Sequence, residues 1–422
     1  IIHLYELDSN GPQAAASAAV ATTLLRLFAL QVLCYGGVTL LTAALNARGS
    51  FAAPAFAPAV NNLVVIGVLL LVGASYGHRN LALAGHDAGF VLLLGLGTTA
   101  GVVAQLLTLL PALGRARIRL RWRWDPGNAA VRSILRLSGW TIGSVVANQV
   151  TLFVILTLAH GVNPDGGASA WTYAYTFFQL PFGIIAVSIM SVVQPELASS
   201  WALGRIGAFR RRLTAGLRAT LGAVLPAAVG YLVLAGPIVD LVLEHGAART
   251  GTASTGGLLA ALALGLPGFS AYLYLTRAYQ AMQDTRTVFV LYLVENAVNI
   301  VLAVVLAGPL GLVGLGLALS VAYTVAALLA LWSLGRGGLG LTPHRVGPAL
   351  GRLTPPCIAM AIAVLWVQGR VGGPAGVALV ARVAASVGLG VSVFALVAVA
   401  GTVLVGARGA RGAGSGRHRQ RR

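Results

Sequence analysis

The sequence predicts an all-α, polytopic membrane protein. Three observations support this fold class: 57% of the 422 residues are hydrophobic, only 9% are charged, and the mean hydropathy is +0.85. Soluble domains carry about 25% charged residues, and a soluble protein of this length would need far more polar surface to cover its core. The long apolar runs of the chain are therefore expected to be membrane-spanning helices.

Eleven apolar stretches are long enough to cross a bilayer, which takes roughly 17–25 residues of helix. They cover residues 23–45, 54–74, 88–110, 137–159, 168–193, 219–243, 256–281, 287–307, 310–334, 353–369 and 377–406. Gly and Pro are abundant in them, as is normal in membrane helices, where small residues let neighbouring helices approach closely. The odd number of spans places the two ends of the chain on opposite sides of the membrane.

The arginines indicate how these spans are oriented. The chain has 29 of them and no lysine, and most lie in alternate connections between the spans. Only Arg79, Arg249 and Arg370 lie in the opposite set, whereas Arg26 and Arg382 lie inside spans, near their ends, and can snorkel. The positive-inside rule then places the C-terminus in the cytoplasm and Ile1 outside. This topology explains the net charge of +19 better than nucleic-acid binding, which is not expected.

Two arginine-rich segments lie outside the predicted spans. The stretch "RARIRLRWRWDP" (115–126) alternates Arg with Ile, Leu and Trp. It fits either an interfacial segment against anionic lipid headgroups or a solvated cytoplasmic loop with tryptophan anchors. The tail at 407–422 is rich in Gly and Arg, a composition typical of disorder.

Polar residues form a row along the span at 168–193. At spacings of 3, 4, 3 and 4, which keep them on one helix face, stand Ser169, Thr172, Thr176, Gln179 and Gly183. Pro181 is expected to kink this helix. The row fits either a hydrated cavity for a polar substrate or hydrogen bonding between helices. Tyr175 and the amides Asn148 and Gln149 are further candidates for the same cavity, although structural hydrogen bonding also explains the two amides.

An ionisable residue, Glu295, lies in the middle third of a predicted span. Burying a carboxyl group at that depth is costly, so such a residue is a candidate functional site. Asn299 follows one turn later, and Ser320 and Thr324 form a similar pair in the next span. Four oxygen-bearing side chains on neighbouring helices can hold a proton or a small hard cation. Alternatively, Glu295 is protonated and hydrogen-bonded in a packed interface.

Motifs of enzymes and of resident metal sites are absent from the sequence. Cys34 and Cys357 both lie in apolar segments and suggest small buried hydrophobes. No two histidines share the spacing of a metal site, and there is no GxSxG, Walker A or HExxH motif. We therefore expect neither an enzyme nor a bound cofactor.

Four stretches, in this order along the chain, resemble the MurJ/MviN family of lipid II flippases in the MOP transporter superfamily. They are "NARGSFAAPAFAPAVNN" (46–62), "YAYTFFQLPFGIIAVSIMSVVQPELAS" (173–199), "GPIVDLVLEHG" (236–246) and "TRAYQAMQDTRT" (276–287). The resemblance implies a flippase of the bacterial cytoplasmic membrane. Such a protein moves the undecaprenyl-pyrophosphate-linked peptidoglycan precursor, lipid II, from the inner to the outer leaflet by alternating access. Membrane lipids and cell-wall synthesis proteins are the other implied partners.

The resemblance also implies how the helices are grouped, because the family has fourteen helices in two six-helix lobes and a terminal pair. The expected parts are three helices of the N-terminal lobe at 1–112, preceded by three more, and an Arg-rich cytoplasmic loop at 113–136. A six-helix C-terminal lobe follows at 137–335, a terminal helix pair at 336–406, and a disordered basic cytoplasmic tail at 407–422. In the family the terminal pair helps to shape a groove for a long lipid tail.

The chain departs from the family's pattern in two places. Where members often carry an Asp-Arg pair that meets the pyrophosphate, this chain has Tyr175 and Thr176, which supply no charge. Glu295 and Asn299 match part of a cation site found in some members, but Ile155 stands where a carboxylate is expected. Sodium, protons and the membrane potential alone therefore stay open as coupling agents.

Three alternative functions also fit the sequence. Two of them are transport functions, namely export of another lipid-linked glycan and drug/cation antiport within the same superfamily. From a different class, the chain fits a non-transporting scaffold for cell-wall synthesis, recruited through its basic loops and tail.

Overall fold

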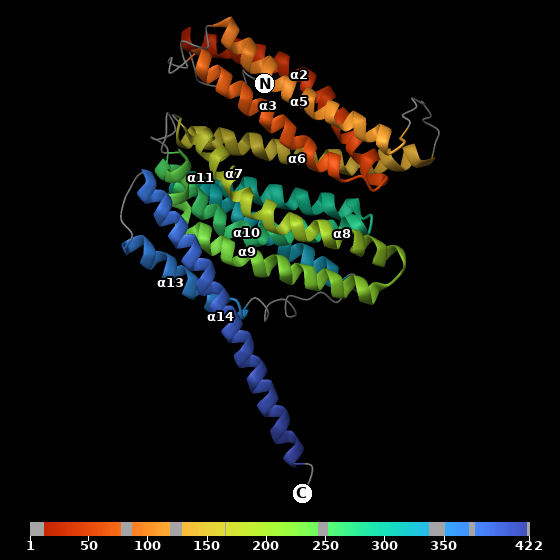
Figure 1. Cartoon of the computed structure of the whole chain (residues 1–422), viewed down its shortest axis with the longest axis vertical. Coiled ribbons are helices and arrows are strands. Elements are labelled where there is room, and N and C mark those ends of the chain that lie inside the picture. The colour runs from red at the N-terminus through yellow and green to blue at the C-terminus, as the bar shows by residue number, and fades with distance from the viewer. Residues whose placement is uncertain are drawn as a thin grey trace. The chain divides into compact units, whose positions relative to one another are not determined.

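The computed structural model describes residues 12–76, 87–118, 129–164, 166–243, 252–336, 351–370 and 376–419. Every secondary-structure element within these ranges is a helix, which confirms the predicted all-α class. The chain divides into two compact units, Ile1–Asp125 and Pro126–Arg422 (Figure 1). The division falls inside the predicted Arg-rich connection at 113–136, of which residues 119–128 lie outside the described ranges.

Within its described residues, the first unit contains the helices α2 (Pro12–Ala47), α3 (Ala52–Tyr76) and α5 (Ala88–Arg115). Helix α5 packs against both of the others, and its Leu109 shares a small apolar core with Leu45 of α2. The turn from α2 to α3 requires a glycine, because Gly49 has a φ of +73°. At the start of α5, the Asp87 carboxylate accepts a hydrogen bond from the Gly89 N–H (2.8 Å) and caps the helix.

The second unit holds the remaining helices. They are α6 (Ala129–Val162), α7 (Gly167–Pro181), the π-helical turn η1 (Phe182–Ala186), α8 (Val187–Ala202), α9 (Ile206–Leu243), α10 (Thr252–Ala281), α11 (Thr285–Leu334), α13 (Thr354–Arg370) and α14 (Gly376–Arg419). Helix α10 is the most deeply buried of the candidate membrane spans and contacts α7, α8, α9 and α11. Helices α13 and α14 pack on each other and on α9.

All eleven predicted spans fall on helices of the described residues. Among these residues, nine helical segments are long and apolar enough to cross a membrane. Helix α11 contains two of the predicted spans, at 287–307 and 310–334. They are separated by Pro309 and by Gly311, whose φ of 60° and ψ of −140° break the helical path. Helix α13 is a shorter element of 17 residues.

Two regions differ in detail from the sequence-based expectation. At Pro181, where a kink is expected, the chain continues into the π-helical turn η1, after which the Val187 N–H bonds the Phe182 carbonyl. Helix α14 continues to Arg419, so the predicted disordered tail is helical over 407–419. Arg and Ala favour helix, and the segment continues directly from an apolar helix. The last three residues lie outside the described ranges.

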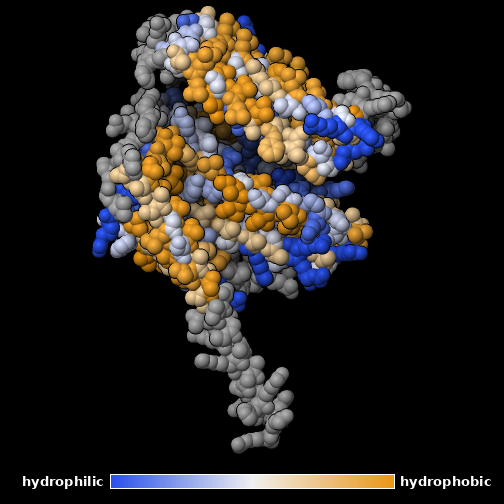
Figure 2. Space-filling model, in the orientation of Figure 1, coloured by the Kyte–Doolittle hydropathy of each residue, from blue (hydrophilic) through white to orange (hydrophobic). Residues whose placement is uncertain are grey.

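The surface is that expected for a protein in lipid. Large apolar side chains stand out along the helices, among them Leu33 (74% exposed), Leu70 (70%) and Leu396 (71%). Figure 2 shows broad hydrophobic areas over the helices, with hydrophilic residues gathered near helix ends. Exposed apolar area on this scale would be a liability in water and is favourable in a bilayer.

Candidate functional site

A polar cavity of about 430 Å³ lies within the second unit, among α6, α7, η1, α10 and α11. Amide groups are contributed by Asn148, Gln179 and Gln280, and none of the residues that line the cavity is charged. Hydroxyl groups come from Thr141, Ser144, Thr285, Tyr175, Tyr292 and Tyr323. The cavity therefore offers many hydrogen-bonding groups and no formal charge.

Aromatic side chains form one wall of this polar cavity. The ring of Phe269 of α10 packs against three other rings. The distances between its centroid and theirs are 4.6 Å for Phe182, 4.7 Å for Tyr323 and 5.0 Å for Phe178. Each such pair contributes about 0.5–1.5 kcal/mol beyond the area that it buries. The cluster joins α7, η1, α10 and α11, so it holds the wall of the cavity in place.

The predicted polar row is only partly at this cavity. Tyr175 and Gln179 line it, as does Asn148 of α6, and their contact with a substrate stays a prediction. The other candidates, Ser169, Thr172, Thr176 and Gln149, are exposed and are not among the lining residues.

The polar row only partly reaches the cavity because the face of α7 that carries the row is rotated slightly from the face that lines the cavity. The residues that face the cavity are Tyr175, Gln179 and, in η1, Phe182. The Thr172 and Thr176 hydroxyls each donate to a carbonyl of their own helix, those of Ala168 (2.8 Å) and Thr172 (2.7 Å). Their hydrogens are thus already used, as is common for threonine in a helix.

Gln280 and Thr285 also line the cavity but were not among the predicted site residues. Both lie at helix ends, and the start of α11 is fixed by Asp284, which accepts from the Thr287 N–H (3.0 Å) and hydroxyl (2.6 Å). Asp is one of the residues favoured at the N-cap of a helix. That signal was available within the stretch "TRAYQAMQDTRT".

A second, smaller cavity of about 100 Å³ adjoins the first, and Asn148, Tyr175 and Tyr323 line both. It contains Glu295 and Asn299, which are only 3% and 2% exposed. The predicted pair is therefore brought together in one buried pocket.

The hydrogen bonds within this pocket are incomplete. The Asn296 amide donates to Glu295 Oε2 (2.8 Å) and to the Tyr292 carbonyl (2.7 Å). The side-chain oxygen of Asn299 is buried and has no hydrogen-bond partner. Ile155 also lines the pocket and supplies no ligand there. In the described part of the chain, no group of three or more His, Cys, Asp or Glu residues lies close enough to hold a metal.

Ser320 and Thr324 do not line the pocket with Glu295. The Ser320 hydroxyl donates to the Ala261 carbonyl of α10 (2.7 Å), and the Thr324 hydroxyl donates to the Ser320 carbonyl (2.8 Å). The pair belongs to the α10–α11 contact, where Gly265 and Gly268 let the two helices approach closely. From this region of α11, Leu319 and Tyr323 line the pocket instead.

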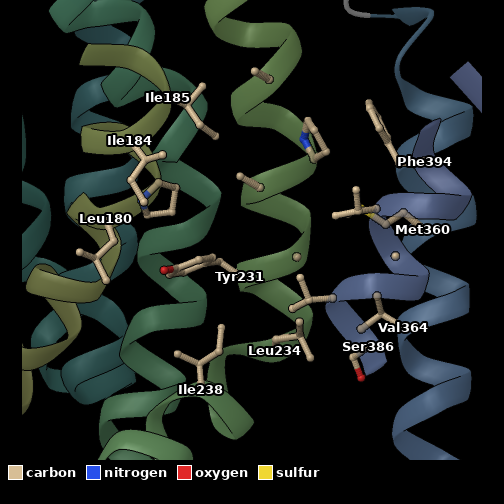
Figure 3. Close-up of a pocket in the computed structure, with 18 residues that line it drawn as sticks. Leu180, Ile184, Ile185, Tyr231, Leu234, Ile238, Met360, Val364, Ser386 and Phe394 are labelled. Carbon is tan, nitrogen blue, oxygen red and sulfur yellow. The ribbon is translucent and has the colours of Figure 1, made fainter. Parts of the chain in front are cut away.

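An apolar groove of about 500 Å³ runs between α7–η1, α9, α13 and α14. Figure 3 shows its walls: Leu180, Ile184 and Ile185 on one side, Tyr231, Leu234 and Ile238 on α9, and Met360, Val364, Ser386 and Phe394 on the terminal pair. The terminal helices α13 and α14 therefore form part of the wall of an apolar groove, and its use by a lipid tail stays a prediction.

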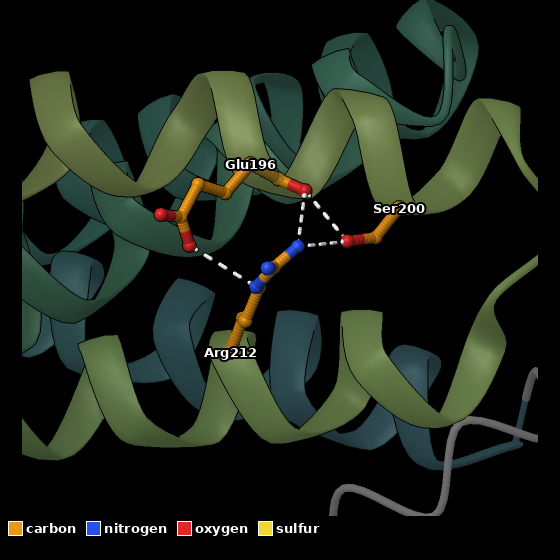
Figure 4. Close-up of polar contacts among 3 residues, drawn as sticks. All are labelled: Glu196, Ser200 and Arg212. Carbon is orange, nitrogen blue, oxygen red and sulfur yellow. Dashed lines mark hydrogen bonds and ion pairs between the residues drawn. The ribbon is translucent and has the colours of Figure 1, made fainter.

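The ends of α8 and α9 are joined by a polar cluster, shown in Figure 4. Arg212 Nε lies 3.0 Å from Glu196 Oε2, and Arg212 Nη1 donates to the Ser200 hydroxyl (2.6 Å). Ser200 in turn donates to the Glu196 carbonyl (2.7 Å). Both charged side chains are about half exposed, so the ion pair adds little stability, but it fixes how the two helices meet.

Solved structures with a fold similar to that of this chain belong to transporters. A lipid II flippase MurJ in an inward closed conformation matches with a TM-score of 0.70 at 21% identity, over 94% of this chain and 76% of that one. A multidrug resistance MATE family transporter of the MOP superfamily, in an inward-facing conformation, matches with a TM-score of 0.63 at 14% identity, over 81% and 76%. The two-unit helical fold is thus of the MOP type.

Sequence comparison gives the family. A probable lipid II flippase MurJ of Rhizobium meliloti (strain 1021) is 30% identical over 331 residues, which is 78% of this chain and 59% of the relative. The lipid II flippase MurJ of Thermosipho africanus (strain TCF52B) is 32% identical over 163 residues, 38% of this chain and 33% of the relative. The chain therefore spans less than two thirds of the length of these relatives. The sequence profile described as "Lipid II flippase MurJ" matches residues 3–384, and the chain belongs to this family.

Proposed function

We propose that this chain acts in moving lipid II, or a similar undecaprenyl-pyrophosphate-linked precursor, from the inner to the outer leaflet of the bacterial cytoplasmic membrane. The observation that carries the proposal is the placement of two unlike sites on one helix. The polar cavity lies along one face of α7–η1, at Tyr175, Gln179 and Phe182, and the apolar groove lies along another, at Leu180 and Ile184. A molecule with a sugar-peptide head and a long isoprenoid chain has these two chemistries.

The cavity suits the uncharged parts of such a headgroup. Amides and hydroxyls can donate and accept hydrogen bonds with sugar hydroxyls and acetamido groups, and the apolar faces of sugar rings can pack on aromatic side chains such as Phe182 and Tyr323. Alternating access would expose this site to each side of the membrane in turn.

We propose further that Glu295 carries the coupling charge, with Asn296 and Asn299 as its partners. A carboxyl group in the membrane interior is stable when a proton or a cation neutralises it. The unpartnered side-chain oxygen of Asn299 can accept a hydrogen bond from a protonated carboxyl group or coordinate a cation. Glu295 is the one acidic residue among those that line this pocket, beside the amides of Asn148, Asn296 and Asn299 and the hydroxyl groups of Thr151, Tyr175 and Tyr323. A proton neutralises the carboxyl group without further ligands, whereas a hard cation takes about six oxygen ligands, so we place the proton before sodium.

The orientation with the C-terminus in the cytoplasm is also part of the proposal. Its support is the series of arginines at one set of connections, among them Arg205, Arg210, Arg277 and Arg336. Reporter fusions at the C-terminus, one active only in the cytoplasm and one only outside it, test this assignment. Activity of the outside reporter alone would reverse it.

A second candidate is drug/cation antiport. A buried carboxyl beside an aromatic-lined cavity is the arrangement that receives organic cations, and the MATE-type structural likeness is compatible with it. The test is reconstitution in liposomes with labelled lipid II and, separately, with ethidium. Protein-dependent appearance of lipid II in the opposite leaflet supports the flippase, and ethidium movement without lipid II movement supports the antiporter.

A further inference from the structure

We infer that Arg382 and Ser386 of α14 form an anion site for the phosphate group of a polyprenyl lipid whose chain occupies the apolar groove. The inference rests on the proposed function in one respect, namely that the groove holds a lipid chain. It adds a polar anchor to a groove that is otherwise almost wholly apolar.

Arg382 lies on the packed face of α14. Leu379 and Ser386, three residues before and four after it, are 1% and 0% exposed. One turn further, Gly390 comes so close to α13 that a Cβ there would lie 2.9 Å from Val364 Cγ2. This spacing of 3, 4 and 4 defines one side of the helix. Arg382 is partly buried and does not itself line the groove, but it lies on the side of α14 that meets α13, one turn beyond the groove-lining Ser386.

Both polar side chains on this face have unsatisfied atoms. Arg382 Nε and Ser386 Oγ are buried without a hydrogen-bond partner. Arg382 is also the one charged residue between Ala378 and Ala400 in the sequence. Asp240 of α9 makes no ion pair with it in the described part of the chain. The Nε group thus lacks a partner although the rest of the side chain is only partly buried, and a phosphate group could supply one, because guanidinium groups bind phosphate oxygens with strong, charge-assisted hydrogen bonds.

The position of the pair along the groove indicates how the ligand lies. Figure 3 shows Ser386 and Ile238 towards one end of the groove and Phe394 and Ile185 towards the other. Arg382 follows one turn beyond Ser386, so a chain lying in the groove would have its phosphate at that end. On α9 this is the end far from the Arg210–Arg218 cluster, which corresponds to the proposed outer leaflet.

The chemistry favours a polyprenyl phosphate over an ordinary phospholipid. The groove between α7–η1, α9, α13 and α14 has a volume of about 500 Å³, which suits a single chain. A phospholipid brings two acyl chains for each phosphate. One isoprenoid chain with a terminal phosphate matches both the channel and its cationic end.

The test uses this protein in nanodiscs of neutral phosphatidylcholine, with binding measured for undecaprenyl phosphate, for undecaprenol and for added phosphatidylglycerol. We expect undecaprenyl phosphate to bind about tenfold more tightly than undecaprenol, the size of one charge-assisted hydrogen bond. Arg382→Gln should remove this preference and leave undecaprenol binding unchanged, which also shows that the groove is intact. Arg382→Lys should keep part of it, and Ser386→Ala should reduce it.

Arg370→Gln is the matched control. Arg370 is at the end of α13, is exposed, and stacks on Trp366 at 5.2 Å, away from the groove. Arg370→Gln, like Arg382→Gln, removes one positive charge from this end of the α13–α14 pair, but it should not change the preference for undecaprenyl phosphate over undecaprenol. A preference that survives Arg382→Gln overturns the anion site, and phosphatidylglycerol competing as well as undecaprenyl phosphate overturns the assignment of the site to a polyprenyl phosphate. Failure of both undecaprenol and undecaprenyl phosphate to bind overturns the lipid groove as well.

Discussion

Gln179 and Leu180 are consecutive residues of α7, yet Gln179 lines the polar cavity and Leu180 lines the apolar groove. One helix therefore separates two environments that differ greatly in polarity. The π-helical turn begins two residues later, after Pro181. Such turns occur often at functional sites, because they rotate the side chains that follow relative to those before.

Gln179→Leu should lower lipid II flipping about two- to tenfold, the loss expected from one or two hydrogen bonds to a headgroup. Thr176→Val is its matched control, because Thr176 lies on the same helix but its hydroxyl is bonded to the Thr172 carbonyl. The measurement is leaflet exchange of labelled lipid II in liposomes, normalised to inserted protein. Equal losses in the two variants would exclude a specific role for Gln179.

Glu295→Gln should remove the response of transport to pH or to a sodium gradient, while the protein still inserts and folds. The amide keeps the size and the hydrogen bond of the side chain but cannot exchange a charge. Ser320→Ala is the control, since its hydroxyl bonds the Ala261 carbonyl of α10. We expect it to reduce stability by about 1 kcal/mol and to leave the response intact. A response that persists in Glu295→Gln assigns the coupling to other groups.

Gly230→Phe should obstruct the apolar groove without disturbing the fold. Gly230 lines the groove, and a Cβ built there meets no atom within 4 Å, so a large side chain can enter the open space. The expected result is reduced flipping with an unchanged unfolding temperature. Gly388→Phe of α14 is the control, because its site is equally open but exposed and outside the groove. Normal flipping by Gly230→Phe would argue against lipid in the groove.

Gly311→Ala should lower the stability of the protein by about 1–2 kcal/mol, because an L-residue is strained at a φ of 60°. Gly308→Ala, three residues earlier, has no positive φ and open space at its Cβ, so it should be neutral or slightly stabilising. Thermal unfolding in detergent measures both variants. Equal unfolding temperatures would mean that the break in α11 is relaxed by other residues.

The sequence predicted most of the helices correctly because the length of an apolar run in a membrane protein is set by the thickness of the bilayer. It also paired Glu295 with Asn299, since residues four apart share a helix face. The same rule paired Ser320 with Thr324, but it could not say which neighbour that face meets. The structure shows that the neighbour is α10, and that Tyr323 faces the pocket instead.

The offset of the polar row on α7 and the walls of the groove were beyond sequence reasoning for a related reason. Periodicity shows which residues lie together, and the cavity at Tyr175 and Gln179 depends on how α6, α10 and α11 close around them. In the groove, Leu234 and Val364 are apolar residues in helices that are apolar nearly all round. Because their sequence neighbours are also apolar, no difference in polarity marks these residues as part of a binding surface.

The turn at Gly311 joins two spans with almost no intervening loop. A protease, an antibody or a membrane-impermeant labelling reagent would find very little there to recognise. Topology mapping by tag insertion would need to avoid this point, since extra residues would have to be accommodated at the bilayer boundary itself, and an apparent absence of signal there should not be taken as a missing crossing.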